Sequence, residues 1–466
     1  MFIGDTIAAI STARGKGGVA LLRISGPDAV SICEKMFLPK SGKKLSEYAP
    51  RTAIFGSIYA PDDRGEWNEI DNGLATVFRA PASFMGEDTV EICCHGGILL
   101  TQTVLTACLA AGARAAEAGE FTRRAFLNGK MGLSAAEALG DLLEAKSESQ
   151  LSLARGGMKG RLSKRMGELY DDLRRVLAGI YAVIDFPDED LSEMSREEME
   201  SEIGRVAADL RRLADTYGTG RAVSEGIPTV ICGRTNAGKS SVYNRILGYD
   251  AAIVTDVEGT TRDVLRETAI LGKATLLLCD TAGLRNTDDK VESIGIERSL
   301  KEIEDAELVL AVFDGTRAPT DEDVSLAEKI DASGVASVAL INKSDLCSAP
   351  YAELVSLCSS FGKTVSVSAA NGEGFDALTA AVEELFIDGE IDIKNDAVVT
   401  GARQFAALNS CCELLCRALE DMRSGVSLDA CCVGIECAMS ALGEVDGREI
   451  GEEIVADIFS RFCVGK

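Results

Sequence analysis

Apolar side chains recur at steps of three or four residues in two regions of the chain, one on each side of its middle. This spacing places the apolar positions on one face of a helix. Pro187 ends the first of these helical stretches, residues 158–184. Gly218, Gly220 and Gly226 then predict a flexible junction. The helices expected from this pattern cover residues 158–184, 199–217, 405–422 and 428–442.

Short continuous apolar runs alternate with helical patterns between residues 227 and 387. Buried strands of a parallel sheet have this pattern, so βαβ units are expected. An acidic connector at 387–396 leads back into helical periodicity. Helical stretches on both sides of an α/β region predict one helical domain interrupted by an insertion. The expected strands include 229–232, 275–279, 308–313 and 337–341.

The N-terminal region differs from both of these parts. Apolar runs at 19–24 and 89–93 are separated by Gly, Pro and Asp, which predicts a mixed α+β domain. A length of 466 residues fits about three domains at roughly 150 residues each. We therefore expect a multidomain α/β protein. Its predicted parts are an N-terminal α+β domain at 1–120, a helical domain at 121–220 and 391–466, and an inserted α/β domain at 226–387.

The charge balance narrows the possible partners. The chain has 74 acidic and 48 basic residues, a formal charge of −26, which excludes a globally basic nucleic-acid coat but permits local basic patches. No apolar run approaches the roughly 18 residues of a membrane span, and Asp5 stands where a secretory signal would carry a basic residue. Fifteen cysteines without an export signal are expected to be reduced thiols. A cytoplasmic protein without a membrane segment is expected.

Residues 233–240 have the pattern GxxxxGKS between a predicted strand and a predicted helix. The glycines let backbone N–H groups and the helix N-terminus face phosphates. Lys239 is expected to reach the β- and γ-phosphate oxygens, and Ser240 to bind Mg²⁺. A plain flexible loop is the alternative, but the strand–loop–helix context favours a phosphate-binding P loop.

Three later motifs predict that the bound nucleotide is GTP. Asp280–Gly283 (DTAG) follows a strand, where Asp280 can hold Mg²⁺ through water, and Thr261 can supply a hydroxyl to the same ion. Asp345 of the NKSD motif can accept two hydrogen bonds from guanine, and Ser368–Ala370 suits a backbone contact to its O6. Taken singly NKSD is a weak signal; in this order it indicates a Ras-like P-loop GTPase domain with a mainly parallel sheet. The expected GTP-binding residues are Asn236, Ala237, Gly238, Lys239, Ser240, Ser241, Thr255, Asp256, Val257, Glu258, Gly259, Thr260, Thr261, Asp280, Thr281, Ala282, Gly283, Asn342, Lys343, Asp345, Ser368, Ala369 and Ala370.

One position departs from the Ras-type arrangement. Leu284 follows the DTAG motif where a glutamine would orient the attacking water, and an apolar side chain cannot do this. Glu292 is a nearby carboxylate that could act through a bridging water. From the residues alone, a solvated loop around Glu292 is an equally good interpretation.

The order of these motifs and the two ends of the chain resemble the tRNA-modification GTPase family MnmE (TrmE). The likeness covers essentially the whole chain. It implies a GTPase that acts with an FAD-binding MnmG (GidA) partner to place an aminomethyl or carboxymethylaminomethyl group on the wobble uridine of certain tRNAs. It also implies a homodimer and a heterotetramer or larger complex with MnmG. Its marks are residues 4–9, 17–26, 83–88, 95–97, 119–130, 185–189, 259–264 and the terminal CVGK at 463–466.

The resemblance also assigns ligands. It implies that the N-terminal domain binds a tetrahydrofolate derivative, in the 5,10-methylene or 5-formyl form, through Arg23, Glu87, Lys130 and Lys466. It implies a K⁺ ion held by Asn236, Thr255, Val257 and Thr260 in place of an arginine finger, since carbonyl and amide oxygens suit a large monovalent cation.

Two catalytic roles follow from the same resemblance, which matches Glu292 to the acid that positions water and Cys463 to a cysteine required for modification. A helix-packing thiol is the alternative for Cys463. For the whole chain, the competing hypothesis is a regulatory or ribosome-assembly GTPase whose helices serve only for docking. The tRNAs, the nitrogen donor and the tRNA-binding surface stay open.

Overall fold

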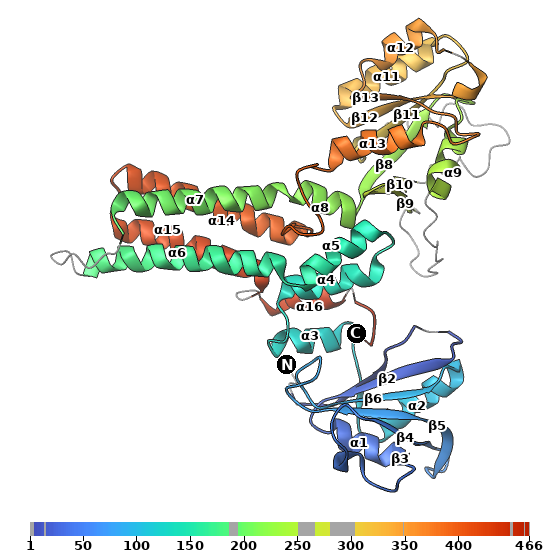
Figure 1. Ribbon diagram of the computed structural model, residues 1–466, viewed down its shortest axis with the longest axis vertical. Helices are drawn as coiled ribbons and strands as arrows, with labels where there is room; N and C mark the ends of the chain where they lie inside the picture. The colour runs from blue at the N-terminus through green and yellow to red at the C-terminus, as the bar shows by residue number, and fades with distance from the viewer. Residues whose placement is uncertain are drawn as a thin grey trace. The chain divides into compact units, whose positions relative to one another are not determined.

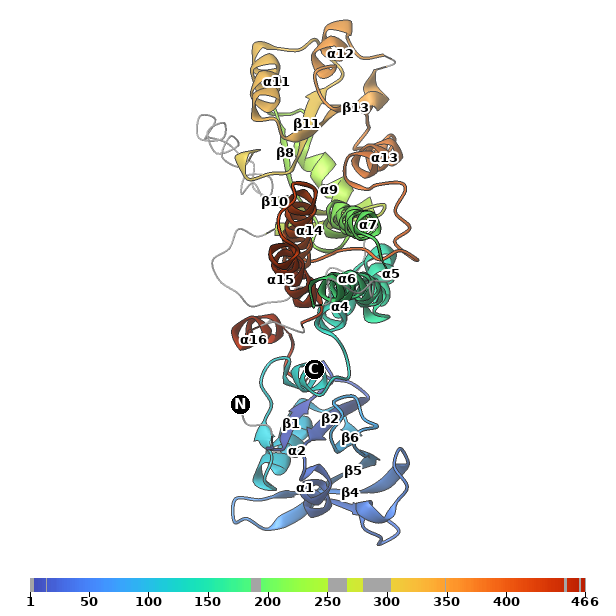
Figure 2. The same ribbon diagram turned by 90° about the vertical axis from the view of Figure 1, so that its left-hand side faces the viewer.

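The computed structural model describes residues 4–13, 15–185, 194–249, 266–279, 303–347, 349–447, 451–460 and 462–465 (Figures 1 and 2). Contacts divide the chain into two compact units. Unit 1 comprises Met1–Gly140 together with Asp446–Lys466, and unit 2 comprises Asp141–Val445. The two ends of the chain therefore belong to one unit.

Unit 1 is built on a seven-stranded sheet with the order β3-β4-β5-β6-β2-β1-β7. Only the β1–β7 pair is parallel; the other neighbours are antiparallel. Along β2, Leu22 and Ile24 are fully buried while Leu21 and Arg23 are half-buried, which is the alternation expected of a strand with one covered face. The strands are β1 (Ile7–Ile10), β2 (Val19–Ser25), β3 (Phe37–Pro39), β4 (Ala53–Pro61), β5 (Trp67–Phe78), β6 (Thr89–His95) and β7 (Arg114–Ala115).

Helices complete unit 1 and confirm the predicted α+β character of the N-terminal region. The core of the sheet is shared with α1 (Ala29–Met36) and α2 (Ile98–Ala110). The C-terminal helix α16 (Glu452–Ser460) buries Val455 and Phe459 with Leu133 and Ala136 of α4. The remaining elements of this unit are the 3₁₀ turn η1 (Leu45–Glu47), α3 (Glu120–Leu127) and α4 (Leu133–Glu144), which continues into unit 2.

Unit 2 contains a bundle of four long helices, seen end-on in Figure 2. Two precede the inserted domain and two follow it, yet all four share one apolar core. The prediction that a helical domain is interrupted by an insertion is therefore confirmed. The bundle helices are α6 (Arg161–Asp185), α7 (Arg196–Asp215), α14 (Ala402–Arg423) and α15 (Leu428–Asp446).

Two expectations about the first helices were wrong. The stretch 158–184 is not one helix, because α5 (Glu148–Met158) ends before Gly160, whose φ is +67°. The residues around Gly218 and Gly220 do not form a flexible junction but lie inside α8 (Tyr217–Ser224). Gly220 packs so closely that an added Cβ would lie 2.0 Å from the carbonyl oxygen of Val399. Close packing against the connector 387–401 explains this glycine, which a sequence pattern cannot distinguish from a loop.

The inserted domain has a six-stranded sheet with the order β13-β12-β11-β8-β10-β9. All neighbours are parallel except the β9–β10 hairpin, which confirms the mainly parallel sheet. Strands β9 and β13 were not predicted. The strands are β8 (Ile227–Gly233), β9 (Arg266–Leu271), β10 (Ala274–Cys279), β11 (Leu308–Asp314), β12 (Ala336–Asn342) and β13 (Lys363–Ser366).

Helices cover both faces of this sheet, as expected of a doubly wound α/β domain. The multidomain α/β fold class is thus confirmed. The predicted domain borders stay predictions, while unit 1 also takes in residues 121–140 and 446–466. Among the described residues, no helix is both long and apolar enough to cross a bilayer. The helical elements of the inserted domain are α9 (Lys239–Tyr249), α11 (Asp321–Ser333), η2 (Ser344–Leu346), α12 (Ala352–Cys358) and α13 (Phe375–Phe386).

Candidate functional site

The GxxxxGKS loop connects the end of β8 to the start of α9. Within it, Asn236 has a left-handed backbone with φ of 65°, which Asn tolerates better than most residues. Gly238 has φ of +97°, and an added Cβ would lie 2.1 Å from Nδ2 of Asn342. Within the same loop, Ala237 is buried. The loop is therefore shaped by its sequence into a turn directly before a helix N-terminus, the geometry that binds phosphates.

Lys239, Ser240 and Ser241 form the first turn of α9. The ammonium of Lys239 donates to the carbonyl oxygens of Gly233, at 2.8 Å, and Arg234, at 3.0 Å. Burial lowers the pKa of Lys239 from its usual value. An anionic phosphate close to this ammonium would offset that desolvation, because an opposite charge favours the ionised form.

Asn342 ties the P loop to the loop that follows β13. Its side chain is buried, its Nδ2 donates to Ala237 O at 3.0 Å, and its Oδ1 accepts from the amide of Ala369 at 3.1 Å. The exposed Asp345 carboxylate accepts from the hydroxyl of Ser368 at 2.6 Å. The structure thus brings the 342–345 and 368–370 segments together beside the P loop, at the carboxyl ends of β8, β12 and β13.

Two cationic side chains support these loops; Lys343 was predicted as a GTP-binding residue, whereas Arg245 was not singled out from the sequence. Arg245 of α9 donates to the carbonyl oxygens of Ala369, at 3.2 Å, and Ala370, at 2.8 Å. Lys343 donates to the carboxylate of Asp314 at 2.7 Å. Burial opposes the charge of Asp314, but hydrogen bonds from Lys343 and Thr316, with the positive charge of Lys343, together outweigh it and lower the pKa of that carboxyl. Neither contact has a sequence signature, because each joins elements far apart in the chain.

Several predicted site residues lie outside the described residues, so their predictions stay predictions. They comprise the DTAG motif, the acid proposed to position water, the last residue of the chain and the segment between the P loop and β9. By name they are Thr255, Asp256, Val257, Glu258, Gly259, Thr260, Thr261, Asp280, Thr281, Ala282, Gly283, Leu284, Glu292 and Lys466.

A second polar site lies in unit 1 around the predicted folate residues. Arg23 of β2 donates to Glu91 at 2.7 Å, and its guanidinium lies 5.9 Å from the ring centroid of Phe84 and 5.6 Å from that of Phe121. Lys130 donates to Pro81 O at 2.9 Å. The stem of Lys130 also passes so close to Gly86 that an added Cβ would lie 3.2 Å from it.

A hydrogen bond from Ser25 of β2 places Glu87 near Arg23. Its Oε2 accepts from the hydroxyl of Ser25 at 2.9 Å. Because Ser25 is two residues after Arg23 on the strand, both side chains lie on the same face of the sheet. Arg23, Glu87 and Lys130 are thus brought to one region of unit 1.

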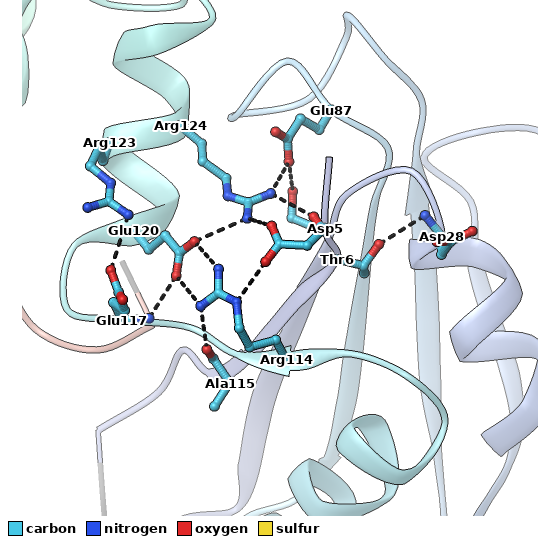
Figure 3. Close-up of polar contacts among 11 residues, drawn as sticks. Asp5, Thr6, Asp28, Glu87, Arg114, Ala115, Glu117, Glu120, Arg123 and Arg124 are labelled. Carbon is cyan, nitrogen blue, oxygen red and sulfur yellow. Dashed lines mark hydrogen bonds and ion pairs between the residues drawn. The ribbon is translucent and has the colours of Figure 1, made fainter. Parts of the chain in front are cut away.

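The same carboxylate oxygen of Glu87 also accepts from Arg124 at 3.3 Å, which links it to a larger ion-pair network (Figure 3). Arg124 donates further to Asp5 at 2.6 Å and to Glu120 at 3.1 Å. Arg114 contacts the same two carboxylates, at 2.7 Å to Asp5 and 2.6 Å to Glu120. Neither arginine was predicted as a site residue from the sequence, although Arg124 lies in the stretch 119–130 that carries part of the family resemblance.

The carboxylates and guanidinium groups of this network stabilise one another's charged forms. Burial raises the pKa of the Asp5 and Glu120 carboxyls, but hydrogen bonds from Arg114 and Arg124 outweigh it and leave both below their usual values. Burial also opposes the charge of Arg124, but Glu87, Asp5 and Glu120 raise the pKa of its guanidinium above the usual value. Asp5 and Glu120 are therefore carboxylates, and Arg114 and Arg124 guanidinium cations, at neutral pH.

The C-terminal tail lies against the segment before α3 and the end of β1. Val464 forms an antiparallel bridge with Ala118, and the amide of Gly119 donates to Cys463 O at 3.4 Å. Gly465 has φ of +99°, and an added Cβ would lie 2.2 Å from Ile10 O at the end of β1. Cys463 is exposed. Its accessibility differs from that of Cys412 and Cys432, which are buried in the helical bundle.

Comparison with known proteins identifies relatives of the whole chain. The model of the MnmE helical domain matches residues 133–463, and the model of the GTP-binding protein TrmE N-terminus matches residues 6–130. A protein described as tRNA modification GTPase MnmE from Clostridioides difficile is 38% identical over 100% of both chains. One with the same description from Symbiobacterium thermophilum is 41% identical over 99% of both chains.

Likeness to solved structures is limited to part of the chain. The G domain of the T. maritima FeoB iron transporter is 21% identical, covers 34% of this chain and 96% of that chain, and has a TM-score of 0.26, which supports no further conclusion. The family models and the full-length relatives identify the chain without it. This chain belongs to the MnmE family of tRNA modification GTPases.

Proposed function

We propose that this protein is a K⁺-activated GTPase that acts with an MnmG-type FAD partner on certain tRNAs in the cytoplasm. In this reaction a tetrahydrofolate derivative supplies the one-carbon unit of a 5-aminomethyl or 5-carboxymethylaminomethyl group at the wobble uridine, position 34. The observation that carries the GTPase part is the contact of Asn342 with both Ala237 and Ala369. It joins a P loop to the segment that carries the guanine-reading groups.

The described residues account for most steps of nucleotide binding. The N-terminus of α9 and the backbone of residues 236–240 face the phosphates, and Lys239 supplies a positive charge for the β- and γ-oxygens. The Asp345 carboxylate, oriented by Ser368, accepts from the N1–H and 2-amino groups of guanine. Adenine lacks that pair of donors, so GTP is preferred over ATP.

The residues present fit the expected cations. The Ser240 hydroxyl lies in the first turn of α9, where a P-loop GTPase holds Mg²⁺, and Thr261 would be the second hydroxyl ligand. The left-handed Asn236 has an exposed side chain whose amide oxygen would hold K⁺, together with Thr255, Val257 and Thr260. When bound, these cations neutralise charge that develops on the phosphates. Glu292 would orient the attacking water in place of the missing glutamine.

Unit 1 offers groups that fit a reduced folate. Arg23 and Lys130 supply cations for the glutamate tail, and Glu87 supplies an acceptor for the donor edge of the pterin. Ser11 Oγ, at the end of β1 beside Gly465, is buried without a hydrogen-bond partner among the described residues. A polar ligand there would satisfy it. Lys466 would add a further cation, and the exposed Cys463 would lie close to the folate.

Partner binding is proposed on the same basis. The chain would form a homodimer through its N-terminal domain and bind MnmG in a heterotetramer or larger complex. Because a net charge of −26 opposes binding to the tRNA phosphates, we propose that the partner makes much of the tRNA contact.

Nucleoside analysis tests the proposal against the ribosome-assembly alternative. Total tRNA from a deletion strain is digested and analysed by mass spectrometry, with a strain carrying the wild-type gene on a plasmid as control. We expect the C5 substituent of wobble uridine to be lost on deletion and restored by the plasmid. An unchanged nucleoside profile with defective ribosomal subunits would favour the assembly function.

The K⁺ site has a separate test. We expect the GTP turnover number to rise at least tenfold when K⁺ replaces Na⁺ at constant ionic strength, because a cage of amide and carbonyl oxygens suits the larger K⁺ better than Na⁺. Asn236→Ala should remove this dependence while leaving GDP affinity within about twofold. Equal turnover of the wild-type protein in the two salts would exclude K⁺ activation but not GTP hydrolysis.

A further inference from the structure

Glu87 is held by one of its two carboxylate oxygens. Oε2 accepts both from Ser25 and from Arg124, whereas Oε1 receives no hydrogen bond within the part of the chain that the structure describes. The side chain is 19% exposed. One oxygen therefore fixes the orientation of the carboxylate, and the other can accept from a ligand.

Arg124 has a more enclosed position than the carboxylate it holds. Its guanidinium side chain is 9% exposed and also donates to the backbone carbonyl of Asp5 at 3.0 Å (Figure 3). Asp5 and Glu120 hold its other nitrogen, and both are held in turn by Arg114. Contacts to Asp5, Glu87 and Glu120 thus leave Arg124 few other orientations. A planar guanidinium is suited to bridging several acceptors in this way.

We propose that Arg124 is a positioning residue for the folate site, which fixes the side chain of Glu87 so that its free oxygen faces the ligand. The inference rests on the proposed folate function of unit 1 and adds to it a residue that does not touch the ligand. Pre-organisation of the acceptor lowers the cost of ordering Glu87 when the pterin donors bind. Ser25 assists by donating to the same oxygen of Glu87.

The network supplies a reason why this position needs arginine. A lysine ammonium is a single point charge and cannot donate to Glu87, Asp5 and Glu120 from two separate nitrogens. A neutral side chain at this position would remove one of the two arginines that lie among Asp5, Glu87 and Glu120. These three neighbouring carboxylates would then repel one another more strongly. Glu87 would then lose both its hydrogen-bond donor and its fixed orientation.

A double-mutant cycle in the full-length protein tests the inference. The dissociation constant for 5-formyltetrahydrofolate is measured by isothermal titration calorimetry for wild type, Arg124→Met, Glu87→Gln and the double variant. We expect Arg124→Met to weaken binding about tenfold to a hundredfold, as for loss of a hydrogen bond to a charged group. In the Glu87→Gln background the same change should cost less than about twofold, because the group it positions is already altered.

Arg123→Gln is the matched control. Arg123 is the preceding residue of α3 and contacts only the exposed Glu117 among the described residues, at 3.2 Å, so its loss should leave folate affinity unchanged. Emission from Trp67, in β5, shows whether unit 1 is folded in each variant. If Arg124→Met does not fold, Arg124→Lys replaces it, with an expected loss of at least fivefold.

The outcomes separate this inference from the proposed function. Equal losses from Arg124→Met in both backgrounds would mean that Arg124 only supports the fold, and unchanged affinity in folded Arg124→Met or Arg124→Lys would likewise overturn the inference. Folate binding by wild type would still stand in these cases. Failure of folded wild type to bind 5-formyltetrahydrofolate would overturn both.

Discussion

At the scale of single residues, base selection depends on the charge and orientation of Asp345. The carboxylate is exposed to a ligand and fixed by a 2.6 Å hydrogen bond from Ser368. We expect Asp345→Asn to raise the KM for GTP about a hundredfold, because an amide nitrogen would face the guanine donors. Xanthosine triphosphate, which has a carbonyl in place of the 2-amino group, should become the better substrate. Steady-state kinetics with both nucleotides measure the change.

A matched substitution on the surface of the same domain provides the control. Asp331→Asn in α11 removes one exposed carboxylate and should leave both KM values unchanged. An Asp345→Asn variant that loses activity with both nucleotides and regains none with xanthosine triphosphate would contradict the assigned role of Asp345.

Residues within ordered motifs could be predicted from the sequence, whereas supporting residues could not. Lys239 and Asp345 follow strands at fixed spacings, so local sequence indicates both their position and their chemistry. Arg245 and Arg124 act on partners more than 30 residues away. An arginine on a helix has no local feature that distinguishes such a contact from solvation.

At the scale of elements, the C-terminal tail depends on one glycine. Gly465 has a positive φ and approaches Ile10 O too closely for any side chain. We expect Gly465→Ala to displace the tail, at a cost of about 1–3 kcal/mol for the strained backbone. Hydrogen exchange should show faster exchange of the Gly119 amide, which donates to Cys463 O in the wild type. Folate affinity should fall, while GTP turnover should change less than twofold.

Gly451→Ala is the control for the tail. Gly451 precedes α16 in the same C-terminal segment, and an added Cβ there meets nothing within 4 Å. The exchange rate of the Gly119 amide should match that of the wild type in this variant. If Gly465→Ala also leaves this rate unchanged, the tail does not depend on the close approach to Ile10.

Elements with a strong apolar period were predicted well, and elements whose ends depend on packing were not. The period of the bundle helices indicates which face is buried, and Val176 and Leu408 are both fully buried. The same period runs across the break at Gly160 because the apolar spacing continues there. Strand β13 has only four residues, too few for a pattern to be recognised.

At the scale of the whole molecule, the two ends of the chain belong to unit 1 and its middle to unit 2. Tryptophan fluorescence reports on the folding of only one of these units. Trp67 is the single tryptophan and lies in unit 1. Its fluorescence therefore follows unfolding of unit 1 in the intact chain, while circular dichroism follows the helices of both units. Different midpoints by the two methods would show that the units unfold separately.

The ion-pair network of unit 1 predicts how its stability depends on pH. The pKa values of Asp5 and Glu120 are lower in the folded protein than in the unfolded chain. Their contribution to the free energy of unfolding is therefore fully present above the unfolded values, about 4, and is lost as pH falls through the folded values. We expect Glu120→Gln to lower the free energy of unfolding by about 2 kcal/mol at pH 7.

That difference between wild type and Glu120→Gln should shrink between about pH 5 and pH 3, because the wild type then loses the same charge by protonation. Urea titrations followed by Trp67 fluorescence measure it at each pH. Glu117→Gln is the control: its side chain is 66% exposed and meets only Arg123 among the described residues, so an effect below about 0.5 kcal/mol is expected. A Glu120→Gln difference that stays constant down to pH 3 would mean that the side chain stabilises unit 1 through packing rather than through its charge.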